Sequence, residues 1–350
     1  MDIITRICRL KAAIIESGIS LGRSLRMSDV TIVIPNYNGI AFLKTCLDSV
    51  LAQTGVQMDV IIIDNGSVDG SQEFISSNYP QCELVCLDQN YGFCRAVNEG
   101  INRAKSPYVI LLNNDTEVRP LFAASLVASM KEDKSRFSCS ARMLMYTKRD
   151  LLDDAGDFYC AFGWGIARGK GRPKQEYGTA DQIFSACGGA AIYQTEMVRL
   201  IGGFDEAHFA YLEDMDLCWR ARIHGWKSWY EPDAEVFHVG SATSGSRYNR
   251  FKVLHSAGNN LYMIYKNMPL AQMLLNMPFL LVGFLIKYLF FVKKGLGKDY
   301  REGLTRGFEL CRKHKDRKVR FLWKNLPAYV AIQVELWKNI LLFLPGRRGK

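Results

Sequence analysis

Acidic side chains occur at two places in this sequence where they could hold a metal ion or move a proton. The first is Asp115, which follows a run of β-branched and large apolar residues at 108–112. Such a run is typical of a strand buried on both faces, and ligands of open α/β sheets gather at the carboxyl ends of these strands. Asp115 is therefore a candidate ligand-binding residue. The alternative is an ordinary turn or helix cap, which is the usual role of an isolated Asn-Asp pair.

The second place is the acidic cluster Glu213, Asp214 and Asp216, at the expected start of a helix. Carboxylates in a first helical turn stabilise the helix through its macrodipole, which accounts for one or two of them. They also follow an aromatic and apolar stretch that would bury them. Burial raises the pKa of a carboxylate, and a raised pKa suits a general base.

Two further features are candidates for contact with a metal or with phosphate. His238 stands at the end of a short predicted strand, as Asp115 does. Most lone histidines are structural, and the position at a strand end makes a metal-ligand role the alternative. The glycine-rich, basic segment 163–172 is either a surface loop or a lid over phosphate groups.

The elements that must position these residues alternate along 30–112. Predicted strands occupy 30–34, 60–63 and 83–87, and each leads through a polar turn into a helical pattern. This order is typical of a doubly wound nucleotide-binding sheet. The first strand is followed neither by the glycine fingerprint of dinucleotide-binding proteins nor by a P-loop, so both of those sites are excluded.

Composition narrows the class of protein. The 350 residues suffice for one large domain with an appendage or for two domains, and 48% hydrophobic and 23% charged residues are ordinary for a globular chain. The net charge of +10 implies an anionic partner, either nucleotide phosphates, a nucleic acid or a membrane surface. The ten cysteines show no CxxC pair and no zinc spacing, which suits a reducing cytosol. Basic residues interrupt the apolar start of the chain, so we expect no secretory signal.

Both ends of the chain carry apolar residues beside cations. Residues 1–27 form a basic amphipathic pattern, which predicts a helix packed on the body of the protein or lying in a membrane interface. The apolar segment 278–292 is short for a membrane-spanning helix and contains Lys287. A basic run at 312–318 and aromatic residues in 319–344 follow it. We expect monotopic attachment to an anionic membrane surface, with a core or oligomer-forming helical pair as first alternative and an RNA-binding face as second.

Six segments together resemble family-2 glycosyltransferases of the GT-A fold, in the rhamnosyltransferase-like branch that builds bacterial surface polysaccharides. They occur in family order within 28–265 and are Ile34–Gly39, Ile63–Ser67, Asn90–Phe93, Leu112–Thr116, Gly202–Glu206 and Glu213–Arg220. The resemblance implies an α/β fold with a GT-A-type nucleotide-binding mixed sheet flanked by helices. We expect three regions: an N-terminal amphipathic basic helix at 1–27, a catalytic domain at 28–265, and membrane-associating amphipathic or hydrophobic helices at 266–350.

The resemblance also implies a binding site for a nucleoside-diphosphate sugar. The residues expected to form it are Pro35, Tyr37, Asn38, Asp64, Asn65, Asn90, Gly92, Asn114 and Asp115. Asp115 corresponds to the surviving acid of the family's Asp-x-Asp metal motif, because Asn113 stands at the first acidic position. A hard cation, Mg²⁺ or Mn²⁺, would be held by Asp115 and His238, with phosphates and waters as the remaining ligands.

For the chemistry, the resemblance implies transfer of a sugar to an acceptor hydroxyl with inversion at the anomeric carbon. Asp214 is the expected base, with Glu213 and Asp216 as second choices. Trp219 and Arg220 would support the acceptor or the diphosphate. The metal would stabilise charge on the departing diphosphate.

The expected donor is dTDP-L-rhamnose, and the expected acceptor is a lipid-linked glycan at the cytoplasmic face of the cell membrane. A UDP-hexose-dependent transferase of the same fold is the first alternative, and a non-catalytic nucleotide- or glycan-binding membrane protein is the second. A nucleotidyltransferase is disfavoured, because it would need a glycine-rich basic loop after the first strand. Nucleic acid is not an expected partner, and the C-terminal helices are the expected contact of a homo-oligomer.

Overall fold

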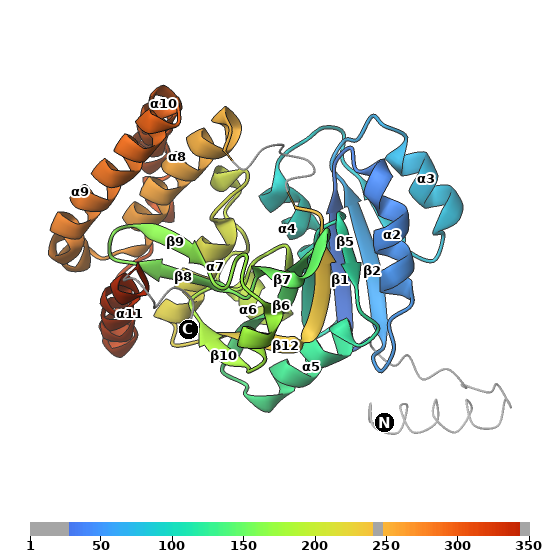
Figure 1. The fold of residues 1–350 in the computed structure, drawn as a ribbon. Coiled ribbons are helices and arrows are strands. Elements are labelled where there is room, and N and C mark those ends of the chain that lie inside the picture. The colour runs from blue at the N-terminus through green and yellow to red at the C-terminus, as the bar shows by residue number, and fades with distance from the viewer. Residues whose placement is uncertain (1–27, 241–247, 344–350) are drawn as a thin grey trace, which may run out of the picture.

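The computed structural model describes residues 28–240 and 248–343, and a mixed sheet forms its centre (Figure 1). Parallel strands make one half of the sheet, in the order β4 (Tyr108–Leu112), β1 (Val30–Asn36), β2 (Met58–Asp64) and β3 (Glu83–Cys86). The other half continues from β4 through β11 (Ala190–Gln194), β6 (Arg136–Met145), β12 (Lys227–His238) and β10 (Asp181–Ile183). Because β11 runs antiparallel to β4 and β6, the sheet is mixed. The predicted α/β fold is confirmed.

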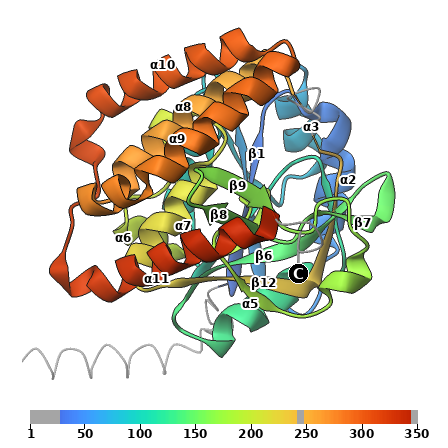
Figure 2. The same cartoon turned by 60° about the vertical axis from the view of Figure 1, so that its left-hand side comes forward.

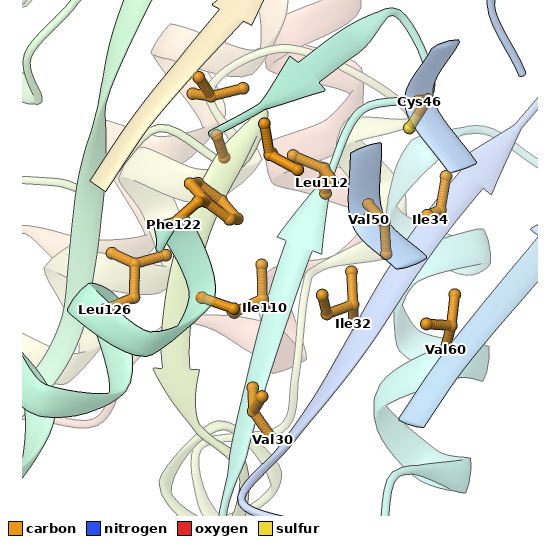
Figure 3. Packing of buried hydrophobic residues seen from close by; sticks show 14 of the residues in the cluster. Val30, Ile32, Ile34, Cys46, Val50, Val60, Ile110, Leu112, Phe122 and Leu126 are labelled. Atoms are coloured by element: carbon orange, nitrogen blue, oxygen red, sulfur yellow. The ribbon is translucent and has the colours of Figure 1, made fainter. Parts of the chain in front are cut away.

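Helices cover both faces of this sheet. One face packs against α2 (Ile40–Leu51), α3 (Ser71–Asn78) and α5 (Phe122–Glu132), and the other against α4 (Phe93–Arg103), α6 (Thr195–Leu200) and α7 (Glu213–Ile223). Successive strand residues point to opposite faces, so each buried strand contributes to both cores. Figure 3 shows the first core, where β1 and β4 meet α2 and α5 through Val30, Ile32, Ile34, Ile110, Leu112, Val50, Phe122 and Leu126.

Four C-terminal helices lie beside α7 and the hairpin of β8 (Asp157–Cys160) and β9 (Trp164–Ala167) (Figures 1 and 2). They are α8 (Arg250–Asn267), α9 (Leu270–Lys293), α10 (Gly297–Lys313) and α11 (Leu326–Lys338). One buried core contains Trp219 of α7, Met263 of α8, Leu280 of α9 and Leu336 of α11. The C-terminal helices are thus joined to the sheet through shared packing, and the predicted boundary at 265 falls near the end of α8. The division into regions 1–27, 28–265 and 266–350 stays a prediction. The helix predicted for 1–27 lies outside the described residues.

Helix α9 is longer than the apolar segment recognised in the sequence, because it continues from Leu270 to Lys293 across Pro278. Within 28–240 and 248–343 it is the one helix that is long and apolar enough to cross a membrane, by length and composition alone. Many of its aliphatic side chains are exposed, among them Leu274, Leu275, Leu281, Leu285 and Leu289. Attachment to a membrane surface stays a prediction.

Buried charges join α7 to α8. The ammonium of Lys266 lies 2.9 Å from Asp216 Oδ2 and 2.6 Å from Asp205 Oδ2. Arg220 Nε donates to Asp216 at 3.0 Å, and Asn267 Nδ2 donates to it at 2.8 Å. Burial by itself would raise the pKa of Asp216, but the charges of Lys266 and Arg220 hold that pKa well below its usual range. We call these five residues the α7–α8 ion network.

Lys266→Met should destabilise the fold strongly, because it leaves Asp205 and Asp216 buried without their shared cation. Removing one partner of a buried ion pair costs about 3–5 kcal/mol, and urea denaturation of the purified protein measures this loss. The matched control is Lys44→Met, which breaks an exposed pair with Asp48 and should leave the unfolding midpoint nearly unchanged. Equal midpoints for the two variants would contradict the importance of the network.

Candidate active site

A cavity of about 740 Å³ opens at the carboxyl ends of the parallel strands. Most residues that the sequence singled out for binding or catalysis line this first cavity, although distant segments supply them. They are Pro35, Tyr37, Asn65, Asn90, Gly92, Asn114, Asp115, Glu213, Asp214 and His238. Parallel strands end at the same edge of a sheet, so the loops that follow them meet there.

Asp115 and His238 face each other because β5 (Thr116–Val118) pairs antiparallel with the end of β12. The pairing sets Thr116 opposite His238, and the N–H of Val239 donates to the carbonyl of Asp115 at 3.0 Å. Nε2 of His238 lies 3.3 Å from Oδ1 of Asp115, and its Nδ1 lies 2.8 Å from Oδ2 of Asp153. A carboxylate on Nδ1 fixes the orientation of the imidazole ring and directs Nε2 into the site.

These two carboxylates keep His238 positively charged at neutral pH. Burial by itself would lower the pKa of the imidazole, but the hydrogen bonds and charges of Asp115 and Asp153 raise it to about 9. Asp153 also accepts from the ammonium of Lys170 at 2.6 Å. Burial would raise the pKa of Asp153, but His238 and Lys170 lower it to about 2. His238 and Lys170 therefore bring positive charge to the cavity beside Asp115.

Sequence reasoning missed Asp153 and identified Lys170 only as part of the basic segment 163–172. Asp153 stands in β7 (Lys148–Asp154), where no local pattern marks it. β7 pairs with β6, and β6 pairs with β12, which brings Asp153 against His238. Lys170 follows in the loop after β9 and lines the first cavity. The basic segment thus contributes a cation to this cavity.

Amide side chains connect the ends of β1 and β4. Oδ1 of Asn36 accepts from Nδ2 of Asn114 at 2.6 Å, while Nδ2 of Asn36 donates to Asp64 at 2.8 Å. Glycine at position 39 permits this approach, because a Cβ there would lie 2.0 Å from Nδ2 of Asn114. Asn114 therefore has a partner that sets its orientation at the cavity wall.

Two residues expected to contact the nucleotide, Asp64 and Asn38, do not line the cavity. Asp64 is fully buried behind its wall and also accepts from the N–H of Ser67 at 2.9 Å and from Gln72 at 2.7 Å. Asn38 is exposed, and its Oδ1 accepts from the N–H of Val68 at 2.9 Å. In the structure both residues shape the loops after β1 and β2, and their direct contact with a nucleotide stays a prediction.

Asp214 enters the cavity directly after a turn with an unusual backbone. Positive φ angles of 63°, 75° and 65° occur at Phe209, Tyr211 and Leu212, a region that residues with side chains rarely adopt. Nδ2 of Asn259 in α8 donates to three carbonyls of this turn, those of His208, Ala210 and Tyr211, at 2.9, 2.8 and 2.8 Å. Such strain persists where surrounding contacts hold it, and it is frequent at functional sites.

Glu213 and Asp214 are neighbouring carboxylates with different surroundings. Burial raises the pKa of both, and the charge of Asp214 raises that of Glu213 further. Asp214 accepts from the N–H groups of Gly188 at 3.0 Å and Met215 at 2.7 Å, which favour its charged form. Oε2 of Glu213 is buried and has no hydrogen-bond partner among the described residues. A proton shared by the pair is therefore favoured on Glu213 over Asp214.

A second cavity of about 460 Å³ lies between the β8–β9 hairpin and helices α8, α9 and α10. Its walls include Lys287 of α9 and Tyr300 of α10. Within the part of the chain that the structure describes, Leu212 and Asp214 are the residues that line both cavities. Molecules bound in the two cavities would meet at the carboxylate of Asp214.

Asp216, Trp219 and Arg220 line neither cavity, so the geometry does not support the catalytic and acceptor-binding roles predicted for them. Positions 214 and 216 point about 200° apart around a helix, which turns Asp216 into the α7–α8 ion network. Arg220 donates to Asp216 and to backbone carbonyls. Trp219 belongs to the core shared with the C-terminal helices.

We expect His238 to titrate near pH 9 in protein without added metal or nucleotide. Burial lowers the pKa of His208 and His255 to about 4, so the signal of His238 should be separable in an NMR titration. Asp153→Asn removes one carboxylate and should lower the pKa of His238 toward its ordinary value of 6.5. Asp150→Asn, at an exposed acid of the same strand, serves as control. A value near 6.5 in the unmodified protein would refute the assigned electrostatics.

Comparison with known proteins finds a family match for part of this chain. Residues 31–201 match glycosyl transferase family 2. The matched span runs from β1 to the end of α6 and includes Asp115, whereas Asp214 and His238 follow it.

Similar proteins support the match over a longer part of the chain. The N-acetylglucosaminyl-diphospho-decaprenol L-rhamnosyltransferase of Mycobacterium tuberculosis is 26% identical over 245 residues, which are 63% of this chain and 79% of that protein. The structure of GalNAc-T7 with UDP, GalNAc and Mn²⁺ has a TM-score of 0.56 at 16% identity. The match covers 69% of this chain and 48% of the GalNAc-T7 chain, so this chain spans about half the length of GalNAc-T7. Mannosyltransferase PcManGT from Pyrobaculum calidifontis, in complex with GDP-Man and Mn²⁺, has a TM-score of 0.52 at 13% identity. This match covers 93% of this chain and 83% of the mannosyltransferase chain. The family match over residues 31–201, the relative and the two solved structures agree: this chain resembles glycosyltransferases of family 2 and shares the fold of these two enzymes.

Proposed function

We propose that this protein transfers a sugar from a nucleoside diphosphate to a hydroxyl group of a lipid-linked glycan, with inversion at the anomeric carbon. The observation that carries the proposal is the position of Asp214 at the junction of the two cavities. An inverting transfer needs a base beside the acceptor hydroxyl, on the side of the sugar opposite the departing diphosphate. Donor in the first cavity and acceptor in the second would satisfy this requirement.

The first cavity has the features that a nucleoside-diphosphate sugar requires. Pro35 and Tyr37 offer apolar surface for the base, and the amides of Asn65 and Asn90 stand beside them. Lys170 brings positive charge for the diphosphate. We favour dTDP-L-rhamnose as donor because the mycobacterial relative is named as an L-rhamnosyltransferase. A UDP-hexose is the alternative.

The side chains of Asp115 and His238 fit a divalent cation, Mg²⁺ or Mn²⁺. Their facing oxygen and nitrogen atoms lie 3.3 Å apart, close to the ~3 Å between neighbouring ligands of an octahedral ion. Asn113 and Asn114 leave Asp115 as the acid of this segment, so phosphate oxygens and waters would complete the coordination. When bound, such an ion neutralises charge on the departing diphosphate.

Asp214 takes the proton of the acceptor hydroxyl in this mechanism. Burial raises its pKa, which makes it a stronger base than an exposed aspartate. Glu213 keeps the shared proton and so leaves Asp214 free to accept one. Asn259 holds the turn before α7 and thereby keeps the carboxylate in position between donor and acceptor.

We also propose that the protein works at the cytoplasmic face of the membrane as a peripheral or monotopic protein. The mycobacterial relative is named for a diphospho-decaprenol acceptor. Helix α9 exposes a series of aliphatic side chains, and the net charge of +10 suits an anionic leaflet. A homo-oligomer formed through the C-terminal helices stays a prediction.

Asp214→Asn should leave donor binding intact and lower the transfer rate by about 10²–10⁴-fold, the usual contribution of a general base. Transfer to a prenyl diphosphate-linked N-acetylglucosamine, assayed with dTDP-L-rhamnose and with UDP-hexoses, measures the rate, and calorimetry measures donor affinity. Glu213→Gln is the matched comparison and should retain much of the activity, because glutamine resembles protonated glutamate. Unchanged transfer by Asp214→Asn would sink the assignment of the base.

Binding of Mn²⁺ in the presence of nucleoside diphosphate should strengthen as pH rises from 6.5 to 8.5. His238 must lose its proton to bind a cation, and with a pKa of about 9 it holds that proton throughout this range. The apparent affinity measured by calorimetry should therefore rise about tenfold per pH unit. Asp115→Asn should weaken the binding at every pH, and EDTA should stop transfer. An affinity that is independent of pH would exclude His238 as a ligand.

A further inference from the structure

The second cavity contains one cation among the described residues that line it, Lys287 of α9. Within 28–240 and 248–343, its ammonium has neither an ion-pair partner nor a hydrogen-bond partner. Burial lowers the pKa of Lys287 to about 8, against a small opposing influence of Cys160. A lysine that lines a cavity and has no counter-ion there can pair with a negative charge that a ligand brings.

Tyr300 of α10 presents a second unsatisfied donor to this cavity. The residue is 2% exposed, and its ring stacks on that of Phe291 with centroids 5.3 Å apart. Its hydroxyl is buried and has no hydrogen-bond partner in the part of the chain that the structure describes. Buried hydroxyl groups are normally hydrogen-bonded, so this one is suited to an acceptor atom brought by a ligand.

The acids of the second cavity do not neutralise Lys287. Within the described residues Lys287 forms no ion pair with Asp157 or Asp214, both of which line this cavity. Burial, and after it the charge of Asp154, raises the pKa of Asp157 well above its usual range, which disfavours its charged form. Asp214 lies at the junction with the first cavity, where it is the proposed base. The second cavity therefore combines an unpaired cation and a free hydroxyl donor, which is the chemistry that binds a phosphate group.

The rim of the second cavity is apolar and continues onto the exposed face of α9. Phe290 lines the cavity and is 39% exposed. Ile286 and Leu289, on the same helix, are 45% and 57% exposed. An apolar chain attached to a phosphate in the cavity could leave along these side chains without crossing a polar surface.

We propose that the second cavity binds the phosphate-bearing end of a prenyl diphosphate-linked sugar, whose phosphate oxygens accept hydrogen bonds from Lys287 and Tyr300. The prenyl chain leaves past Phe290 onto α9, and the sugar hydroxyl lies at Asp214. This inference rests on the proposed function, because it names the acceptor chemistry of the same transfer.

Farnesyl diphosphate is the probe for this site, used with the whole chain in detergent and with saturating nucleoside diphosphate to fill the first cavity. Lys287→Met should weaken binding about tenfold or more, because a charge-assisted contact is lost, while Lys287→Arg should retain most of it. Tyr300→Phe should weaken it less than Lys287→Met. Lys293→Met, at an exposed lysine of α9 that does not line the cavity, should bind as the unmodified protein does. Farnesol, which lacks the phosphates, should bind weakly to every form.

The inference is overturned if the unmodified protein does not bind farnesyl diphosphate, or if Lys287→Met binds it equally well. Equal competition by dioleoylphosphatidylglycerol would also overturn it, since the cavity would then be a general site for anionic lipids. Hydrolysis of nucleotide sugars, measured in the same preparations, tests the proposed function separately. Lysine-dependent binding of farnesyl diphosphate in a protein that hydrolyses no nucleotide sugar would support the phosphate site and refute the transfer.

Discussion

The contact of Lys266 with the carboxylates of Asp205 and Asp216 is the constraint on which the active site depends. Desolvated charges are tolerated only when they are paired, so this contact holds α7 against α8 in one position. Asn259 lies two turns earlier on α8 and binds the carbonyls of the turn before α7. Residues seven apart lie on nearly the same side of a helix. One face of α8 therefore contacts two segments: Lys266 binds α7, which carries Asp214, and Asn259 binds the strained turn that positions Asp214.

Two further groups of charged side chains line the first cavity, and in each the neighbours decide which side chain carries the charge. Glu213 and Asp214 are adjacent, yet backbone N–H groups stabilise the charge on Asp214 alone. In the second group, Asp115 and Asp153 hold the imidazolium of His238 between them, and Lys170 pairs with Asp153. The first arrangement provides a charged base on α7, and the second directs a ring nitrogen of β12 at Asp115.

The C-terminal helices complete the site as well as covering it. They share a core with α7 through Trp219, and α8, α9 and α10 form most of the second cavity. Phe251 and Lys252 of α8 also line the first cavity, so a sheet domain without these helices would lose part of the first cavity and most of the second. The apolar exterior of α9 and the polar lining at Lys287 are then two sides of one helix, which suits a substrate that is apolar at one end and charged at the other.

The sequence by itself determined the parallel half of the sheet and the loops at its carboxyl ends. The apolar run at 108–112 and its polar end were recognisable because strand burial and turn chemistry are local properties. Its motifs also indicated the resemblance to family-2 glycosyltransferases and singled out Asp115, Asp214 and His238, which line one cavity in the structure. Only the tertiary structure separated Asp214 from Asp216, brought Asp153 of β7 onto His238, and placed Asp64 behind the wall of the cavity. These outcomes depend on which side chains meet across strands and helices that lie far apart in the chain. Local periodicity does not encode such pairings, because they are decided by packing and by the need to pair each buried charge.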